Sequence, residues 1–481
     1  MTDVAVVGSG PNGLAAAVIM ARAGLSVQVF EAGPTAGGGS RTKELLEPGH
    51  RYDVCSAVHP MALASPFFRR FELADRIKLT VPEISYAHPL DGGDAGLAYK
   101  DLERTVEGLG ADGPAFRKLM SPLVRRSEAI TELLMSPLIR GYRQPGAALA
   151  FGRAALDQGT PLWNTRFTAD KAPALLTGVA AHPVGRMPSL PSAGGGLLLA
   201  LLAHTVGWPV PDGGSQAIAD AMVKDLQAHG GELVTDHRVS SLDEVRGART
   251  VLLDVSPRTL LELAGPELPG RYAGALGRFR YGNAACKVDF ILSGPVPWAN
   301  REVGRAGTVH LGGRRAELAA AEAQVAAGEH PHKPYVLLSQ PSTFDSSRAP
   351  AGRHILWTYC HVPAGSTVDM TEAVTAQIER FAPGFRDVVV RSQVTTAADL
   401  ERYNENYVGG DFGGGAVNLW QMAARPVPAV NPWQTPLPGI YLCSASTPPG
   451  PGVHGMGGFH AAGLALRRRH ALPMPDLGVN S

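Results

Sequence analysis

The sequence predicts an α/β fold that is built around a parallel sheet. An apolar, β-branched segment at residues 4–7 leads through a glycine-rich turn into a helix-forming segment, and a second strand-like segment follows. A stretch of similar composition runs from residue 211 to residue 254. Strand and helix patterns that alternate in this way are typical of βαβ units, whose strands lie parallel.

The N-terminal unit shows each part of such a βαβ arrangement. Residues 4–7 form the first strand, and the turn Gly8–Gly13 joins it to a helix of small residues at 14–23. Gly24 ends this helix, and residues 27–30 resume strand character. The unit spans about 30 residues, which suits a right-handed parallel crossover.

Further elements follow from local patterns along the chain. The Leu-rich segment 194–208 predicts a buried helix, because it is short for a bilayer and ends at Pro209. Further helices are predicted over residues 215–229 and, at the surface, over 314–327. Strands are predicted near residues 232–235, 250–254, 285–292 and 354–361. The last residues, 473–481, are predicted to form a frayed tail.

Composition and charge exclude several classes of function. The 44 Lys and Arg residues balance 43 Asp and Glu, so no excess positive field exists to attract nucleic acid. The N-terminus lacks the pattern of a secretory signal, so we expect a cytoplasmic protein. Peripheral membrane contact through the Leu-rich segment stays an open alternative, although the sequence does not indicate it.

The cysteine and histidine patterns argue against metal and dithiol sites. The four cysteines, at positions 55, 286, 360 and 443, never form C-x-x-C. This argues against a disulfide scaffold, a zinc site and a redox-active dithiol. His330 and His332 flank a proline, which favours a solvated loop, so no metal is predicted.

The turn after the first strand fits the G-x-G-x-x-G pattern of dinucleotide-binding sites. Its glycines allow a tight turn, a close approach to pyrophosphate and close packing of helix on strand. Glu31 ends the second strand, where a carboxylate can accept hydrogen bonds from ribose hydroxyls. The predicted contacts in this segment are Gly8, Gly10, Pro11, Asn12, Gly13 and Glu31.

The sequence thus predicts a Rossmann-type domain that is discontinuous along the chain, in the manner of glutathione reductase, and a second, α+β substrate domain. The nucleotide-binding domain is assigned residues 1–75, 205–270 and 426–470. The substrate domain takes residues 76–204 and 271–425, and residues 471–481 form a tail.

Two glycine-rich segments resemble those of the flavoprotein superfamily of amine oxidases and phytoene desaturases. The first, Ala36–Thr42, resembles G-G-x-x-R-[ST], although Gly39 stands where relatives often carry an arginine. The second, Pro438–Ala462, resembles the C-terminal flavin-binding strand, loop and helix, with Ser444-Ala445 in place of the usual Gly-Asp. The resemblance implies FAD, with further contacts from Gly37, Gly38, Arg41, Val239, Ser444, Gly452, Val453, Gly455 and Met456.

Together with segments 52–60 and 408–415, these motifs identify the chain as similar to phytoene dehydrogenase-related FAD-dependent oxidoreductases. The resemblance implies dehydrogenation or desaturation of a hydrophobic organic substrate, with hydride transfer to the flavin. A second glycine fingerprint for NAD(P)H is absent, so the electron acceptor is left open between oxygen, a quinone and a protein.

Three residues are candidates for catalysis, each with a structural alternative. His454 lies in the loop that is expected to reach the flavin, but it can equally cap the last helix. His59 follows the glycine cluster, where a structural turn is the alternative. Lys287 lies on a predicted strand that resembles the lysine-bearing strand of amine oxidases, or it is a solvated strand residue.

Two rival functions stay open. Some carotenoid isomerase relatives use FAD without net redox change. A flavoprotein fold can also be kept as a non-catalytic interaction partner, which the Ser444-Ala445 replacement makes conceivable.

Overall fold

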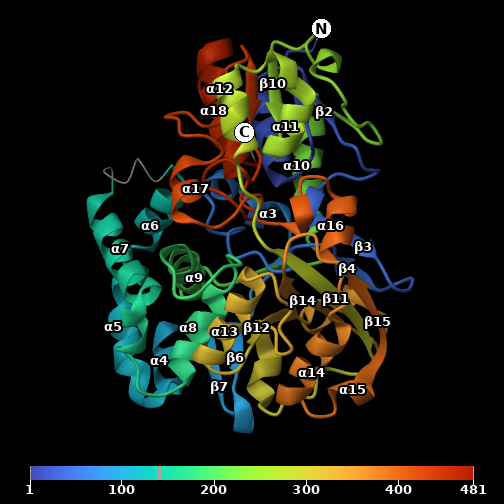
Figure 1. Ribbon diagram of the computed structural model, residues 1–481. Coiled ribbons are helices and arrows are strands. Elements are labelled where there is room, and N and C mark those ends of the chain that lie inside the picture. The colour runs from blue at the N-terminus through green and yellow to red at the C-terminus, as the bar shows by residue number, and fades with distance from the viewer. Residues whose placement is uncertain (1, 138–143, 480–481) are drawn as a thin grey trace.

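The computed structural model describes residues 2–137 and 144–479 and contains two main sheets. Figure 1 shows them one above the other: the five-stranded sheet with its helices lies near the N-terminus, and the seven-stranded sheet lies at the opposite end. Helices α4 to α9 form a layer beside the second sheet.

The five-stranded sheet is parallel throughout, which confirms the predicted Rossmann-type fold. Its order is β16 (Ile440–Leu442), β10 (Thr250–Leu253), β1 (Val4–Val7), β2 (Val27–Phe30) and β9 (Glu232–Val234). The central strand β1 is buried on both faces, as expected for a parallel sheet between helical layers.

Alternate residues of β1 enter different cores. Val4 and Val6 pack with the helices α1 (Pro11–Arg22), α10 (Gln216–Ala228) and α18 (Met456–Ala465). Ala5 and Val7 pack on the other face with α11 (Pro257–Ala264) and α12 (Gly270–Gly277). The strand period of two therefore builds a three-layer domain.

The seven-stranded sheet is mixed, and only β12 and β6 pair in parallel. Its order is β15 (Val389–Thr395), β11 (Ala284–Leu292), β14 (His354–Val362), β13 (Val336–Ser339), β12 (Ala306–Leu311), β6 (Ile84–Pro89) and β7 (Ala95–Tyr99). Two small antiparallel pairs join β3 (Thr42–Glu44) to β4 (Arg51–Asp53) and β5 (Leu79–Thr80) to β8 (Val210–Pro211).

The remaining helices lie mainly beside the seven-stranded sheet or between the two main sheets. They are α2 (Pro66–Arg70), α3 (Leu73–Arg76), α4 (Leu102–Gly108), α5 (Gly113–Val124), α6 (Ser127–Leu134), α7 (Pro145–Gly159), α8 (Lys171–Ala180), α9 (Leu190–Ala203), α13 (Arg315–Ala326), α14 (Thr371–Phe381), α15 (Phe385–Val388), α16 (Ala397–Tyr403) and α17 (Leu419–Ala424). No helix in these described residues is both long and apolar enough to cross a membrane.

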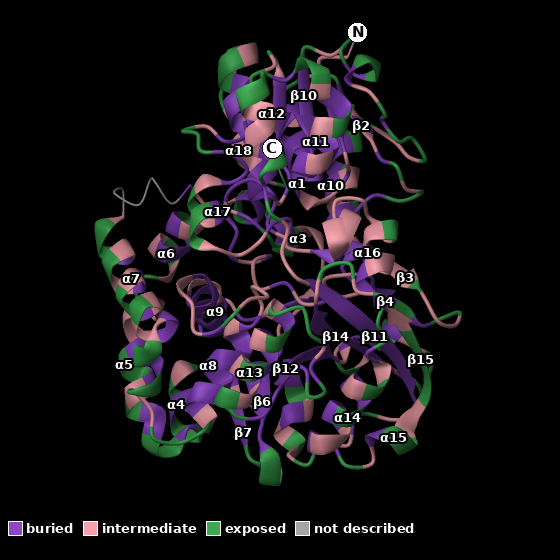
Figure 2. Cartoon of the chain, in the orientation of Figure 1, coloured by how far each residue is buried: buried purple, intermediate pink, exposed green. Residues whose placement is uncertain are grey.

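The buried Leu-rich helix is confirmed, with earlier ends than predicted. Helix α9 begins after Ser189, whose hydroxyl accepts a hydrogen bond from the Ser192 amide, and it ends at Ala203. Figure 2 shows α9 almost wholly buried. Trp208, expected at the end of this helix, lies beyond it and is buried in the core.

Of two predictions about the surface, one is confirmed and one is wrong. Helix α13 lies at the surface as predicted: one face is exposed, and Glu322 on the buried face contacts His361 at 2.8 Å. The tail was expected to fray, yet the Leu477 side chain is buried and its carbonyl accepts a hydrogen bond from Arg76. A partner far away in the sequence therefore holds the tail.

Candidate functional site

A cavity of about 630 Å³ lies between the two sheets. One side is formed by the loops that follow β1, β2, β10 and β16, at the carboxyl ends of parallel strands. The other side is formed by the seven-stranded sheet and α9. Strands β2 and β10 flank β1 on opposite sides, and such a switch point is where open α/β sheets bind ligands.

The glycine turn is tight enough to require each of its three glycines. A Cβ at Gly13 would lie 2.1 Å from the Gly8 carbonyl oxygen, and a Cβ at Gly10 would lie 2.6 Å from Asp254 Oδ2. Gly8 itself has a φ of +95°, a backbone conformation that side chains other than glycine rarely adopt. The turn therefore presents bare backbone to the cavity at the start of α1.

Glu31 follows β2 and is held firmly in place. Its Oε2 atom accepts hydrogen bonds from the Ser9 amide and hydroxyl, and its Oε1 atom accepts one from the Gly33 amide at 2.7 Å. Arg41 forms an ion pair with Oε1 at 2.8 Å. The carboxylate lines the cavity in a fixed orientation, where it can accept hydrogen bonds from ligand hydroxyls.

Asp254 is a site residue that the sequence analysis missed. It follows β10 directly, and its Oδ2 accepts a hydrogen bond from the Gly13 amide at 2.9 Å. Burial, with a smaller contribution from the nearby charge of Glu31, raises the pKa of this carboxyl to about 7. Its position at the carboxyl end of a predicted parallel strand was a signal that could have identified it.

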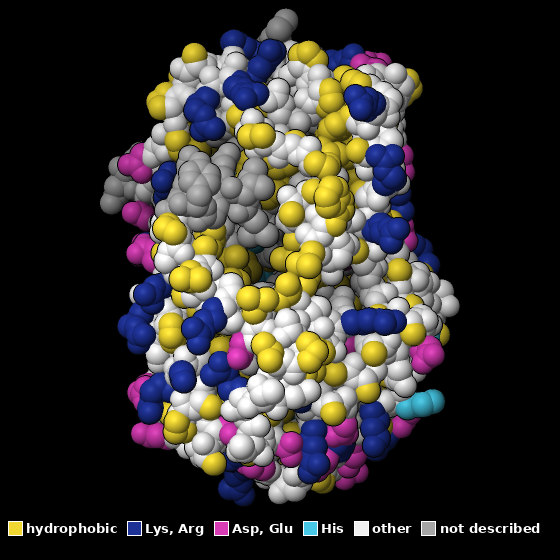
Figure 3. All heavy atoms as spheres, turned by 60° about the vertical axis from the view of Figure 1, so that its left-hand side comes forward, with side chains coloured by type: hydrophobic (Ala, Val, Ile, Leu, Met, Phe, Trp, Pro, Cys, Tyr) yellow, Lys and Arg dark blue, Asp and Glu magenta, His cyan; other side chains and the backbone are white. Residues whose placement is uncertain are grey.

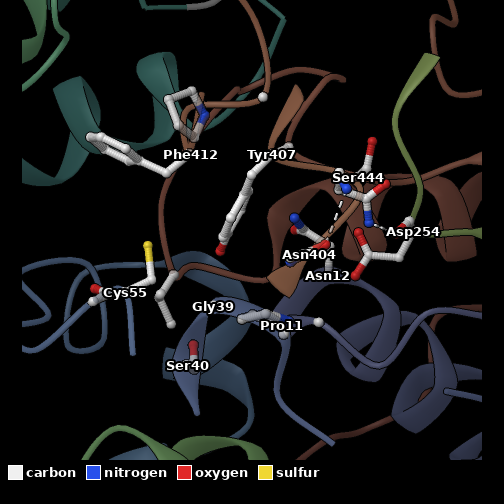
Figure 4. A pocket seen from close by; sticks show the side chains of 18 of the residues that line it. Pro11, Asn12, Gly39, Ser40, Cys55, Asp254, Asn404, Tyr407, Phe412 and Ser444 are labelled. Carbon is white, nitrogen blue, oxygen red and sulfur yellow. Dashed lines mark hydrogen bonds between the residues drawn. The ribbon is translucent and has the colours of Figure 1, made fainter. Parts of the chain in front are cut away.

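Tyr407 explains why the chain tolerates glycine at position 39. A Cβ at Gly39 would lie 2.1 Å from the Tyr407 hydroxyl, so this hydroxyl occupies the space of a side chain there. Figure 4 shows Cys55, Tyr407 and Phe412 on one side of the pocket, whereas Asn12 and Asp254 lie on the other. Tyr407 thus fills the space that a side chain at position 39 would occupy.

The C-terminal loop closes the cavity beside the glycine turn. Ser444, Gly452 and Val453 line the cavity, as does Val239 from the loop after β9. The side chain of Asn12 accepts a hydrogen bond from the Gly457 amide at 3.0 Å, which ties the start of α1 to the start of α18. Two distant segments therefore form one binding surface.

Four of the residues predicted to contact a cofactor support the cavity without lining it. They are Gly13, Gly37, Gly455 and Met456. A Cβ at Gly455 would lie 2.5 Å from Phe67, and the Met456 amide donates to His454. The predicted residues Gly8, Gly10, Pro11, Asn12, Glu31, Gly38 and Arg41 do line it.

His454 is placed as a helix cap. Its Nδ1 atom accepts a hydrogen bond from the Met456 amide at 3.0 Å, so Nε2 carries the proton and donates to the Gly450 carbonyl at 3.1 Å. Burial lowers its pKa to about 4, so the ring is neutral near pH 7. Both ring nitrogens are used within the loop, which favours the structural alternative.

His59 lines the cavity and has a defined tautomer. The Ser215 hydroxyl donates to the Ser56 carbonyl, so His59 Nε2 donates to that hydroxyl at 2.7 Å. His59 Nδ1 is therefore unprotonated, and it has no hydrogen-bond partner among the described residues. Burial lowers the pKa of His59 to about 4, so the ring is a neutral acceptor.

Lys287 is neither solvated nor at the cavity surface. It lies on β11, only 3% exposed, and forms an ion pair with Asp289 two residues along the same face. Its ammonium group lies 5.8 Å from the centre of the Trp357 ring, and Trp357 lines the cavity. Lys287 can therefore influence the cavity only through its neighbours.

The remaining wall of the cavity is mainly apolar and aromatic. Figure 3 shows hydrophobic side chains gathered around a hollow on one face of the molecule. The lining residues on this side include Leu198, Leu199, Trp208, Thr308, Leu337, Trp357, Tyr359 and Phe412. Leu198, Leu199 and Trp208 belong to the apolar segment that was predicted to be buried, whereas the strand residues Thr308, Leu337, Trp357 and Tyr359 were missed, because only strand register brings them together.

The comparisons with known proteins agree with this arrangement. Residues 6–71 match the model of the NAD(P)-binding Rossmann-like domain. The chain is 26% identical to pyridine nucleotide-disulfide oxidoreductase domain-containing protein 2 of Rattus norvegicus, covering 97% of this chain and 93% of that protein. It is 34% identical to 4,4'-diapolycopen-4-al dehydrogenase of Metabacillus indicus over 132 residues, 26% of each chain.

A solved structure of putrescine oxidase, a double mutant from a redesign of cofactor binding, has a TM-score of 0.60. It is 18% identical and covers 97% of this chain and 99% of its own. The predicted family resemblance and fold class are confirmed. The chain has a flavoprotein oxidoreductase fold, and over nearly its whole length it is similar to pyridine nucleotide-disulfide oxidoreductase domain-containing protein 2.

Proposed function

We propose that the protein is an FAD-dependent oxidoreductase that dehydrogenates or desaturates a hydrophobic organic substrate. One observation carries the proposal: a single cavity joins the dinucleotide cradle at the ends of β1 and β2 to an apolar wall on the other sheet. Such a cavity can hold the cofactor and an apolar substrate side by side.

The residues at the cradle fit FAD. The turn around Gly10 lines the cavity with backbone that carries no side chain, which allows the close approach of a pyrophosphate, and Glu31 can accept hydrogen bonds from the ribose hydroxyls. The buried hydroxyl of Ser40, which lines the cavity, has no hydrogen-bond partner among the described residues and is free to bind a polar cofactor atom. When bound, FAD supplies the acceptor for a hydride, and the protein supplies orientation and shielding.

The substrate side of the cavity contributes by excluding water. Leu198 and Leu199 of α9 and the ring of Trp208 form an apolar surface that favours an apolar ligand. His59 is neutral near pH 7, and its Nδ1 can accept a hydrogen bond from the substrate or the cofactor. In the proposed reaction the electrons leave the flavin for oxygen, a quinone or a protein partner.

The proposal is tested by flavin content in a matched pair of variants. Gly13→Ala places a methyl group against the Gly8 carbonyl, and we expect the purified variant to lack FAD. Gly152→Ala in α7 adds the same methyl group where no atom lies within 4 Å, and we expect full FAD content. Equal FAD content in both variants would contradict the assigned cradle.

The reaction itself is tested without oxygen. Candidate apolar alcohols, amines and alkenes are mixed with the FAD-loaded protein under nitrogen, and flavin absorbance is followed. Bleaching by a substrate, with recovery of the spectrum when an acceptor is added, is the expected result. A substrate that is converted without bleaching and without consumption of acceptor would overturn net oxidation.

A further inference from the structure

Building on the proposed function, we propose that the substrate carries a neutral oxygen atom, such as a carbonyl or hydroxyl oxygen, on an otherwise apolar body. The unpaired hydroxyl of Thr308 and the unpaired indole N–H of Trp357, both on the seven-stranded sheet, are the groups that can bind this oxygen. An unsubstituted hydrocarbon, which the apolar wall alone would suggest, would leave both groups without a partner.

Strand register places Thr308 and Trp357 on the same face of the sheet. Ser339 of β13 pairs directly with Trp357 of β14, and the β12–β13 register continues from Val309↔Leu338 to bring Thr308 opposite Ser339. Residues that lie directly opposite each other in neighbouring strands share a face. The two residues therefore belong to one row across three strands, and both line the cavity.

Both side chains are buried and lack a partner. Thr308 is 1% exposed and Trp357 is 4% exposed. The Thr308 hydroxyl oxygen and the Trp357 indole nitrogen have no hydrogen-bond partner among the described residues. Buried polar groups in native proteins are paired as a rule, and an unpaired group costs about 1–3 kcal/mol. A ligand atom that pairs with them would remove this cost.

The chemistry of the two groups selects the ligand atom. An indole N–H can only donate a hydrogen bond, so its partner must be an acceptor, and the threonine hydroxyl can donate as well. Lys287, whose ammonium group lies 5.8 Å from the centre of the Trp357 ring, is already paired with Asp289. Because this ion pair already neutralises the lysine, and Asp289 lies opposite Trp357 in the sheet, a neutral oxygen fits the site better than a carboxylate.

The surroundings of the pair are apolar. Leu337 and Tyr359 lie in the neighbouring row on the same face, and Leu198 and Leu199 of α9 also line the cavity. A ligand bound to Thr308 and Trp357 would therefore have its oxygen at the sheet and its hydrocarbon part against these side chains.

The test uses two probes of nearly the same shape, acetophenone and α-methylstyrene, which differ by an oxygen atom in place of a methylene group. Binding of each to the FAD-loaded protein is measured by titration calorimetry. We expect acetophenone to bind roughly tenfold more tightly or better, since one or two hydrogen bonds to buried donors are gained. Thr308→Val keeps the size of the side chain, and Trp357→Phe keeps an aromatic ring but removes the N–H donor; each should reduce this preference.

Thr308→Ser is the control, because it keeps the hydroxyl and should keep the preference for acetophenone. Equal binding of the two probes, or failure of acetophenone to bind, would overturn the proposal, since water would then satisfy the two groups. Flavin absorbance of the same samples distinguishes a failure of this proposal from a failure of the proposed function. Colourless protein contradicts the cofactor, whereas calorimetry reports ligand binding whether or not flavin is present.

Discussion

Replacing Asp254 by asparagine should make FAD bind more tightly and remove most of the pH dependence of binding. The Asp254 carboxyl lines the cavity at the N-terminus of α1, beside the glycine turn that is expected to hold the pyrophosphate, and it accepts a hydrogen bond from the Gly13 amide. The charged groups around it are the Glu31 carboxylate and the phosphates of the cofactor, and the Cys443 thiol also lies close. A second anion there opposes FAD, so binding favours protonated Asp254.

The size of the effect follows from the pKa of Asp254, which burial raises to about 7. If FAD binds only the protonated form, its dissociation constant rises about tenfold for each pH unit above 7. Between pH 6 and pH 9 this amounts to roughly a hundredfold loss of affinity. Asparagine keeps an acceptor for the Gly13 amide and carries no charge, so the variant should show an almost constant affinity.

The same pKa predicts how the protein without cofactor responds to pH. A carboxyl whose pKa is higher in the folded chain stabilises it below the unfolded pKa, and this stability is lost as pH rises through the folded pKa. A rise from 3.8 to about 7 corresponds to about 4 kcal/mol, lost between roughly pH 4 and pH 7. The asparagine variant should therefore gain stability relative to the native chain toward pH 8.

The assay is titration of FAD into the cofactor-free protein, followed by quenching of flavin fluorescence at pH 6, 7, 8 and 9. Asp411→Asn is the control: this carboxyl is also buried and accepts three backbone N–H groups, but it does not line the cavity. The control should keep the pH dependence. An affinity of the native chain that does not change with pH would refute the reasoning.

Three further predictions test individual side chains. Glu31→Gln should weaken FAD binding about tenfold, because charge-assisted hydrogen bonds to the ribose are lost, and fluorescence titration measures this. His454→Ala should lower the free energy of unfolding by about 1 kcal/mol, with His454→Asn restoring it as a cap; lost turnover in both folded variants would instead support catalysis. Lys287→Met should cost about 3–5 kcal/mol in chemical denaturation by leaving Asp289 buried without its partner, and an unchanged midpoint would contradict this ion pair.

The nucleotide-binding fold could be predicted from the sequence because its signals are local. The strand, the glycine turn and the helix lie within the first 30 residues. The spacing of the three glycines was therefore enough to identify the turn. The start of the last helix near Gly455 was predicted on the same kind of signal. The binding residues of such glycine-rich loops are neighbours in the sequence, so a sequence motif is enough to find them.

The substrate side could not be predicted, because its residues meet only through tertiary structure. Asp254 contacts Gly13 across 241 positions of the chain, and Thr308 shares a row with Trp357 only through the register of three strands. Lys287 was expected at the flavin or in solvent, but pairing with Asp289 keeps it buried. The spacing of residues along the sequence does not reveal such contacts between distant segments.

The identity of the chromophore tests the central claim most directly. The purified protein is denatured, and the released small molecule is identified by its visible spectrum and its mass. We predict one FAD per chain, bound in the cavity between the two sheets. Protein that is colourless and does not take up added FAD at pH 6, where Asp254 is protonated, would contradict the claim.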